Sequence, residues 1–262
     1  MSSEVETSLE ISGSRRIPRL LDSARNDKAQ QATRPLFADL TIYHDENPHS
    51  AAMNMAIDEA LLETAGVPTL RFYRWRSPAL SFGYFGKFSD VAIYAAKRDL
   101  IRRWTGGGIV FHGDDLTYSI VIPASDPVFD ESSIAIYEKI HRALAKALNT
   151  SSGRVELAES ARCADRIPQR GLPTNDCFAS PVRADVMMDG RKIAGAAQRR
   201  TRRGLLQQGS IQSVPMKTDL ARKFAQALST NCSELEVTEE TFQRARELAQ
   251  LKYGSGSWLQ KR

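Results

Sequence analysis

Apolar residues recur at helical spacing in four segments of the chain. In the segment 50–65, a stripe at positions i, i+4, i+7 and i+8 consists of Met53, Ile57, Ala60 and Leu61. Ser50 before this stripe is a typical helix N-cap, and Gly66 is typical of the residue just past a helix end. The same spacing predicts three further helices, over 132–149, 216–229 and 238–252.

Between these helices the chain alternates strand-like runs with turn residues. Strands are predicted over 69–75, 79–85 and 116–123, and a strand, glycine loop and second strand over 101–111. Asp189-Gly190 separates two more strand-like runs, and an Asp-Gly pair in that setting is a strong hairpin signal. A turn near 201–204 leads into a last strand, LLQQGSIQ.

The remaining segments carry weaker patterns. We expect a short helix from Ser89 or Asp90 to Arg98 and a loop over 150–178, which is rich in Ser, Arg, Pro and Gly. Residues 1–36 are Ser-rich with mixed charge, which predicts a disordered or loosely held N-terminal extension. We therefore expect one catalytic domain over 37–262.

The bulk composition excludes several classes of protein. The 262 residues are 42% hydrophobic and 26% charged, which is enough to bury a sizeable core. No apolar run approaches the roughly 18–20 residues that span a bilayer, and no secretory signal is present. The three cysteines and four histidines are scattered, so we predict no metal site and no disulfide framework. These features together favour the cytoplasm.

A basic strip occupies residues 183–203. It holds seven Lys and Arg against two Asp, so its local excess equals the +5 net charge of the whole chain. Such a strip suggests an acidic partner. Aromatic residues are not interleaved in it, which argues against nucleic acid. A solvated hairpin is the alternative interpretation.

The most informative motif is the glycine run in RRWTGGGIVFH. Gly106, Gly107 and Gly108 contribute no apolar side chain, so core packing does not explain them. With Arg102 and Arg103 before the run and His112 after it, the loop can hold a phosphate or a pantetheine-like group through backbone amides and charge. It matches neither the P-loop nor the dinucleotide-binding pattern. A tight turn without a ligand is the alternative.

A second segment, GRKIAGAAQRR, carries a lysine among small residues. Strict alternation places Lys192, Ala194 and Ala196 on one face, and Gly195 allows a close backbone approach. Lys192 can then stabilise an oxyanion or lower the pKa of a thiol, or it can simply face solvent. Cys177, in the polar loop NDCFASP, is either a structural thiol or a nucleophile on this evidence. His141 lies on the helix 132–149, where we expect a surface or edge position.

These blocks together resemble a known family. RRWTGGGIVFH, GRKIAGAAQRR and LLQQGSI, in this order, are similar to lipoate-protein ligases and octanoyltransferases, which share a fold with biotin protein ligases. Residues 69–91 also look like that family's opening strands, so the resemblance covers about 37–215. It implies an α+β fold with mixed, largely antiparallel sheets packed with helices.

The pattern DCF–SP before GRK resembles the cysteine-dependent octanoyltransferases, which puts the nucleophile on Cys177 and its helper on Lys192. The resemblance assigns substrate binding to Arg102, Arg103, Gly106, Gly107, Gly108, His112, Gly195 and Gln198. The implied reaction moves an octanoyl or lipoyl group from acyl carrier protein, through a cysteine thioester, to a lysine of a lipoyl-domain protein. That acceptor is the glycine-cleavage H protein or the lipoyl-bearing subunit of a 2-oxoacid dehydrogenase. No cofactor and no ATP are implied.

One position departs from the family pattern. Gln208 stands where the family often carries histidine, and glutamine does not titrate near pH 7. Lys192 or His112 would then have to move protons. Three alternatives stay open: an ATP-dependent lipoate ligase, an amidotransferase between lipoyl-domain proteins, and a binding module without catalysis. The absence of an accessory C-terminal domain after the catalytic region favours the transferase over the ligase.

Overall fold

The main sheet brings together strands from the two ends of the described chain. The computed structural model describes residues 35–45, 47–148, 154–159, 178, 181–214 and 219–261, and residues 35–262 fall in one compact unit. The sheet order is β11-β1-β2-β6-β10-β9-β8-β7. The strands are β1 Asp39–His44, β2 Thr69–Tyr73, β6 Leu116–Pro123, β7 Val155–Leu157, β8 Val186–Met188, β9 Arg191–Arg200, β10 Gly204–Ile211 and β11 Asn231–Leu235.

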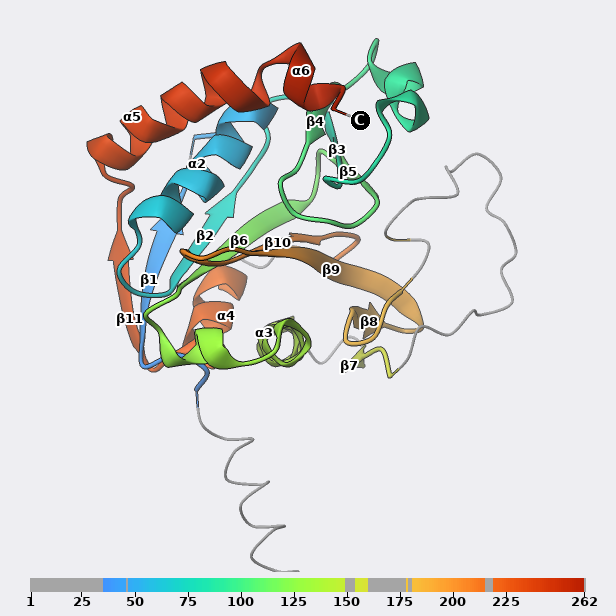
Figure 1. Cartoon of the computed structure of the whole chain (residues 1–262). Coiled ribbons are helices and arrows are strands. Elements are labelled where there is room, and N and C mark those ends of the chain that lie inside the picture. Colours follow the sequence, from blue (N-terminus) through green and yellow to red (C-terminus); the bar gives the residue numbers. More distant parts are fainter. Residues whose placement is uncertain are drawn as a thin grey trace, which may run out of the picture. The chain divides into compact units, whose positions relative to one another are not determined.

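Strand β1 is parallel to both β11 and β2, and the other neighbours in this sheet are antiparallel. Helices cover both faces, as Figure 1 shows. The mixed, largely antiparallel α+β fold predicted from the sequence is therefore confirmed.

Helices α3 (Ser133–Leu148) and α4 (Leu220–Leu228) cover one face of the sheet. The i, i+4, i+8 stripe of α3 (Ile136, Ile140 and Leu144) is fully buried in the same apolar cluster as Phe224 of α4. That cluster includes alternate residues of β6, because side chains along a strand point to opposite faces in turn.

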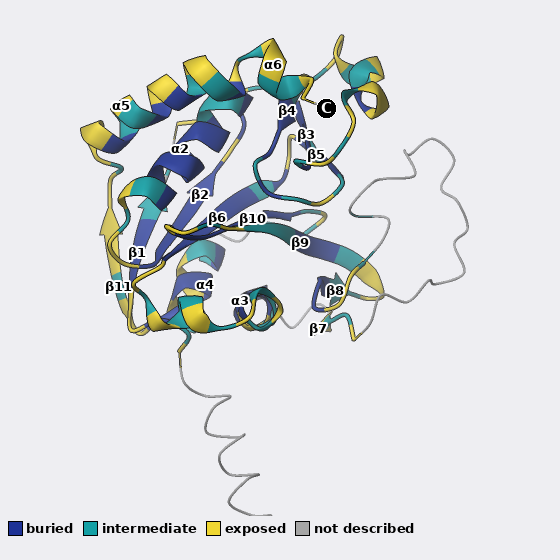
Figure 2. Ribbon diagram, viewed as in Figure 1, coloured by how far each residue is buried: buried dark blue, intermediate teal, exposed yellow. Residues whose placement is uncertain are grey.

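Helix α2 (Ala51–Thr64) covers the other face, and α5 (Glu239–Leu248) packs on the outer side of α2. The Ser50 side chain accepts a hydrogen bond from the Met53 amide, which confirms the predicted N-cap. Thr238 caps α5 in the same way. Figure 2 shows that the sheet and α2 are mostly buried, whereas α5 exposes its outer side.

A small second sheet lies beside the large one in the order β4-β3-β5, with β3 Ala79–Phe82, β4 Asp99–Arg102 and β5 Ile109–His112. Strand β3 is parallel to β4 and antiparallel to β5. The connection from β4 to β5 is the glycine run. Of the residues singled out in RRWTGGGIVFH, Arg102 and His112 therefore lie in the small sheet, and Arg103 and the three glycines lie in its β4–β5 connection.

Several predicted elements need correction. Residues 89–98 form two short 3-10 turns, Phe88–Asp90 and Ala92–Tyr94, instead of one helix. Val155–Leu157, expected within a loop, is strand β7. Strands β1 and β11 were not predicted, and a π-helical turn, Ala249–Tyr253, and the short helix α6, Gly256–Leu259, follow α5.

The predicted N-terminal extension lies outside the described residues except for its last two. In the described chain, no helix combines the length and apolar character that crossing a membrane requires.

Candidate active site

A cavity opens where the small sheet meets β9 and β10 of the large one. It contains about 470 Å³ of space free of protein atoms, part of it open to solvent, which is a usual size for a small-molecule site. Its lining is Met55, Tyr73, Trp75, Ser81, Arg103, Val110, His112, Thr117, Phe178, Lys192, Gly195, Ala196, Ala197, Gln208, Gly209 and Ser210. Four of the predicted site residues, Arg103, His112, Lys192 and Gly195, are thus brought together.

Lys192 forms the basic side of this cavity. Its Nζ lies 2.8 Å from Oδ2 of Asp185, and both side chains are buried, at 6% and 0% exposure. Asp185 also accepts hydrogen bonds from the Tyr137 hydroxyl at 2.6 Å and from the Val182 amide at 2.7 Å. Both carboxylate oxygens of Asp185 therefore have partners. Lys192 is held in place as a buried cation rather than exposed to solvent.

The strict alternation predicted for β9 is interrupted by a β-bulge. Val186 pairs with Ala194 while Met187 pairs with Lys192, so Ile193 is the extra residue. The bulge puts Ala194 in the apolar core beside α3, whereas Gly195 follows Lys192 on the cavity wall. The prediction that Ala194 shares the face of Lys192 was wrong for this reason.

Cys177, the predicted nucleophile, lies outside the described residues, and so does Cys163. Phe178, which follows Cys177 in the sequence, lines the cavity, and the Lys192 Nζ lies 5.3 Å from its ring centroid. Cys232 lies on β11, where burial and the charge of Glu234 raise its pKa and disfavour a thiolate. Its position therefore does not favour a nucleophilic role.

The glycine run is shaped around Arg103. Nη2 of Arg103 donates to the carbonyl oxygens of Gly106 at 3.0 Å and Gly108 at 2.9 Å. Gly107 has φ of +84°, a conformation that favours glycine. None of the three glycines lines the cavity; they hold the arginine that does.

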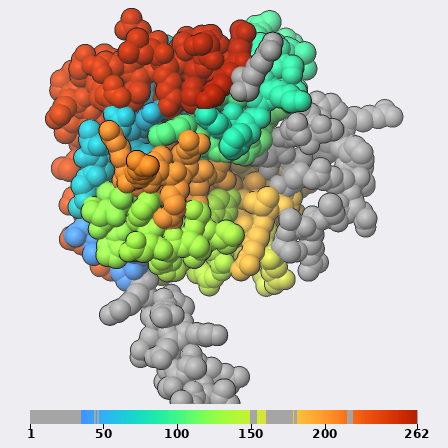
Figure 3. Space-filling view, viewed as in Figure 1, coloured from blue at the N-terminus to red at the C-terminus, as the bar shows by residue number. Residues whose placement is uncertain are grey.

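Arg102 points away from the cavity. Its guanidinium is buried and donates to five main-chain carbonyls, those of Tyr84, Gly86, Trp258, Leu259 and Lys261. In Figure 3 the red C-terminal segment adjoins the teal segment that contains Tyr84. Arg102 thus joins these two segments, and the structure places it outside the predicted substrate site.

Gln198 is also turned away from the cavity. Its Nε2 donates to Oε1 of Gln207 at 2.8 Å, and Gln207 in turn donates to the Tyr118 hydroxyl in the core. Neither glutamine lines the cavity.

His112 is held between two partners. Its Nε2 lies 2.7 Å from Oγ of Ser81, and its Nδ1 lies 2.7 Å from Oδ2 of Asp115. Trp75 stacks on the imidazole at 4.1 Å between ring centroids. Ser81 and Asp115 were missed by sequence reasoning, because only the pairing of β3 with β5 brings Ser81 to the histidine.

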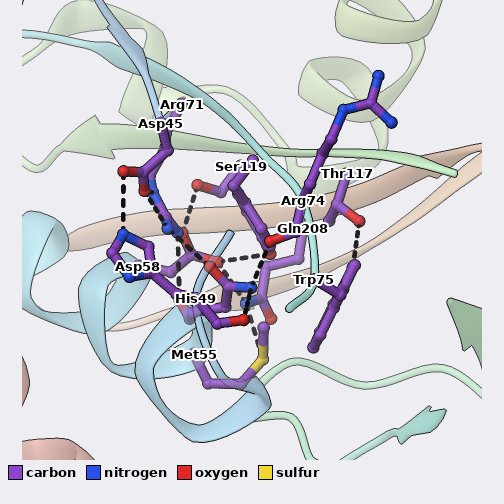
Figure 4. A network of polar contacts seen from close by, with 12 residues as sticks. Asp45, His49, Met55, Asp58, Arg71, Arg74, Trp75, Thr117, Ser119 and Gln208 are labelled. Atoms are coloured by element: carbon purple, nitrogen blue, oxygen red, sulfur yellow. Dashed lines mark hydrogen bonds and ion pairs between the residues drawn. The ribbon is translucent and has the colours of Figure 1, made fainter. Parts of the chain in front are cut away.

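A buried polar network supports one wall of the cavity (Figure 4). Asp58 of α2 accepts hydrogen bonds from Arg71 at 2.8 Å and from Gln208 at 2.7 Å, and further ones from Ser119 and Tyr73. Oε1 of Gln208 accepts a hydrogen bond at 2.8 Å from the hydroxyl of Thr105, which lies at the start of the glycine run. The signal that was overlooked is Asp58 itself, a charged residue between buried apolar ones in the sequence.

His141 differs from the expected surface position. It is fully buried and contacts the Tyr118 hydroxyl at 3.1 Å and the Ala184 carbonyl at 2.7 Å. Burial lowers its pKa to about 4, so it is neutral at pH 7. It lies outside the cavity lining and has a structural role.

Comparison with known proteins identifies the family to which this chain is related. The sequence model of the lipoyl protein ligase A/B catalytic domain matches residues 50–251. The octanoyltransferase LipM of Oceanobacillus iheyensis is 38% identical over 187 residues, 67% of this chain and 66% of the relative. LipM of Symbiobacterium thermophilum is 31% identical over 261 residues, 78% of this chain and 92% of the relative. For the relatives from O. iheyensis, Macrococcus caseolyticus and Clostridioides difficile, the chain spans 66%, 63% and 64% of their length.

Solved structures show the same fold. Lipoate-protein ligase A bound with ATP has a TM-score of 0.63 at 22% identity, covering 86% of this chain and 98% of that chain. The bi-partite lipoate protein ligase of Thermoplasma acidophilum has a TM-score of 0.62 at 20% identity, covering 86% and 96%. At these identities the likeness concerns the fold alone. The match of the family's sequence model over most of the chain shows that this chain belongs to the lipoyl protein ligase A/B catalytic domain family.

Proposed function

We propose that this protein is an octanoyltransferase of lipoylation. It takes an octanoyl or lipoyl group from acyl carrier protein, holds it as a thioester on Cys177, and passes it to a lysine of a lipoyl-domain protein. The observation that carries this proposal is Lys192, which is paired with the buried Asp185 and lines the same cavity as Phe178, the chain neighbour of Cys177. Relatives named octanoyltransferase LipM support the same activity.

The chemistry is a double displacement. The Cys177 thiolate attacks the carbonyl carbon of the donor thioester, a new C–S bond forms, and the C–S bond to the donor breaks. The donor leaves as a thiolate, which takes up a proton from water. The acceptor amine then attacks the enzyme thioester, an amide bond forms, and the Cys177 thiolate is released. Lys192 contributes a fixed positive charge that favours the thiolate and stabilises the oxyanion of both steps.

The basic strip fits the proposed partners. Arg183, Arg191, Arg200, Arg202 and Arg203 are all exposed, whereas Lys192 and Asp185 of the same segment are buried. Arg183 and Arg191 lie near the start of β9, and the other three lie near its end. Exposed arginines attract acidic proteins and speed their encounter. Acyl carrier protein and lipoyl domains of this pathway are typically acidic, which suits these exposed arginines and a cytoplasmic location.

The acceptor class has further support from a relative. The bi-partite ligase of T. acidophilum is described together with its E2 lipoyl domain. We propose a lipoyl domain of a 2-oxoacid dehydrogenase, or the glycine-cleavage H protein, as the acceptor here. Because the donor thioester is already activated, the reaction proposed for this chain needs neither ATP nor another cofactor.

Intact-mass analysis tests this proposal. The protein is mixed with octanoyl acyl carrier protein without nucleotide, and we expect a mass increase of one octanoyl group that Cys177→Ala abolishes. Cys232→Ala is the matched control and should retain the adduct. Strict dependence on ATP together with a fully active Cys177→Ser would overturn the transferase in favour of a ligase.

An amidotransferase is separated by its donor. Octanoylated H protein replaces the carrier protein in the same assay, and transfer from H protein but not from the carrier protein would assign amidotransfer instead. A stable complex with the carrier protein and no turnover would point to a binding module.

A further inference from the structure

Three hydrogen-bonded side chains form a line that ends in the cavity. Asp115 contacts Nδ1 of His112 at 2.7 Å, and Nε2 of His112 contacts Oγ of Ser81 at 2.7 Å. Ser81 and His112 both line the cavity, while Asp115 is buried behind them. A carboxylate, an imidazole and a hydroxyl in this order are the elements of a general-base relay.

The surrounding groups fix the direction of both hydrogen bonds. Nη1 of Arg103 donates to Oγ of Ser81 at 2.7 Å, and because arginine has no acceptor, the Ser81 oxygen must accept that bond. The single Ser81 proton is then left for Nε2 of His112. Asp115 is acceptor-only when ionised, so Nδ1 of His112 carries its proton toward Asp115. His112 is therefore a neutral base with Nε2 facing Ser81.

Asp115 is fixed in position by further hydrogen bonds. Asp115 also accepts from the Gly113 amide at 3.0 Å, Thr117 at 3.0 Å and Ser210 at 2.8 Å. Burial alone would raise the Asp115 pKa, but His112 and these hydrogen bonds lower it, so Asp115 is ionised at pH 7. The indole of Trp75 stacks on His112 and donates to Thr117 at 2.7 Å.

An acceptor lysine needs such a base. A lysine amine has an ordinary pKa of about 10.4 and is protonated at neutral pH, and an ammonium cannot attack a carbonyl. On the basis of the proposed function, we propose that Ser81, His112 and Asp115 form a proton relay that deprotonates the acceptor lysine. The relay is separate from Lys192, which acts on the acyl group.

The proton path balances without another reactant. The acceptor ammonium first gives one proton to Oγ of Ser81 as the Ser81 proton passes to Nε2 of His112, and the relay releases this proton to water. The neutral amine then attacks the thioester carbonyl carbon, and its nitrogen gives a second proton through the same relay, which leaves an imidazolium paired with Asp115. Collapse of the tetrahedral intermediate breaks the acyl–sulfur bond. The imidazolium then returns its extra proton through Ser81 to the departing thiolate, or releases it to water. Arg103 stays charged throughout and favours the neutral form of an approaching amine.

The charged and titratable groups around His112 set the working pH. They are Asp115, three residues after His112, Arg98 and Arg103, which flank β4, and Tyr73 and Lys192 in the cavity lining. Burial lowers the pKa of His112, Asp115 opposes this shift, and Arg103 and Arg98 add to it. The base is therefore neutral from neutral pH upward, and wild-type transfer to lysine should vary little above pH 7.

A comparison of two acceptors tests the relay. Octanoyl transfer to a lipoyl domain is measured for wild type, Ser81→Ala and Asp115→Asn, and then with hydroxylamine, an amine that is already unprotonated at neutral pH. We expect both variants to lose about 100-fold with the lipoyl domain and much less with hydroxylamine. Their rates with the lipoyl domain should rise with pH toward the pKa of lysine. Ser89→Ala, an exposed serine outside the cavity, is the control and should match wild type in both assays.

Three results would contradict the relay. Equal losses with both acceptors would indicate a structural role, and a flat pH profile in Ser81→Ala would show that no proton transfer was lost. An octanoyl ester on Ser81 would make this residue a nucleophile instead. If Ser81→Ala unfolds, Asp115→Asn carries the comparison. A failure of the proposed function would give a different result, because the wild-type protein would then form no octanoyl adduct. In that case the lipoyl domain and hydroxylamine are compared as acceptors with octanoate and ATP as the acyl source.

Discussion

Gly195 leaves open the space that the Lys192 side chain occupies. A Cβ atom at Gly195 would lie 2.5 Å from Nζ of Lys192 and 2.4 Å from Cε, and 3.1 Å from the Asp185 carboxylate. The missing side chain thus lets the lysine fold back along its own strand to reach Asp185. The glycine of GRKIAG is required by its neighbour three residues earlier, in addition to any ligand.

Gly195→Ala should therefore act through Lys192. The added methyl group displaces the amine from Asp185 and from the cavity, and a shift of about 1 Å in a catalytic group costs on the order of 100-fold in rate. Octanoyl-enzyme formation is the measurement. Gly66→Ala is the control, since a Cβ there meets no atom within 4 Å. Full activity in Gly195→Ala would show that the position of Lys192 is unimportant.

Removing Asp185 should destabilise the fold through the charge that remains. Asp185→Ala leaves Lys192 buried without its carboxylate and deprives Tyr137 of its acceptor, and breaking a buried pair costs about 3–5 kcal/mol. Urea unfolding measures this loss. In the double variant Asp185→Ala/Lys192→Met, the buried charge is gone, so stability should largely recover while transfer stays absent. A double variant no more stable than Asp185→Ala would argue against this explanation.

Arg102 and Arg103 should behave differently although they are adjacent. Lysine cannot replace the six hydrogen bonds that Arg102 makes to five carbonyls, so we expect Arg102→Lys to lower the free energy of unfolding by about 3 kcal/mol. Limited proteolysis should then release residues near 255–261 earlier than in wild type. At temperatures where the variant is folded, transfer should continue. Loss of transfer at unchanged stability would instead return Arg102 to the substrate site predicted from the sequence.

His141 should make the fold sensitive to acid. Its pKa is about 4 in the folded protein, and an unperturbed histidine titrates near 6.5. Between these two pKa values His141 is protonated in the unfolded chain and neutral in the folded one. The free energy of unfolding therefore decreases as pH falls from about 6.5 to about 4. The shift corresponds to about 3 kcal/mol. His141→Gln should flatten this part of the stability profile by urea unfolding, and an unchanged profile would assign the acid sensitivity elsewhere.

The sequence predicted those elements that are determined by residues close to one another in the chain. The α2 helix follows from Ser50 and its apolar stripe, and the β8–β9 hairpin from Asp189-Gly190. Strand β11 was not predicted because it is short, polar and largely exposed, and its strand conformation depends on its pairing with β1. The bulge at Ile193 likewise depends on the partner strand, so periodicity within β9 gave no sign of it.

The sequence indicated several residues of the site, but not which side chains contact one another. Arg103, His112, Lys192 and Gly195 were singled out by residue type and resemblance, and the cavity contains them all. Ser81 was not, because a serine in a buried strand has no local signal of function. Arg102 and Arg103 have the same chemistry in sequence, and only the strand's alternation sends one to the C-terminal carbonyls and the other to the cavity.

The pairing of β1 with β11 has a consequence for how the chain is made. Asp39 pairs with Asn231, so β1 is synthesised long before its partner strand β11. Such a distant pairing closes slowly. Until it closes, β1 presents an open row of amide and carbonyl groups to other molecules. Incomplete or nicked chains that lack β11 are thus the forms of this protein that should associate with one another.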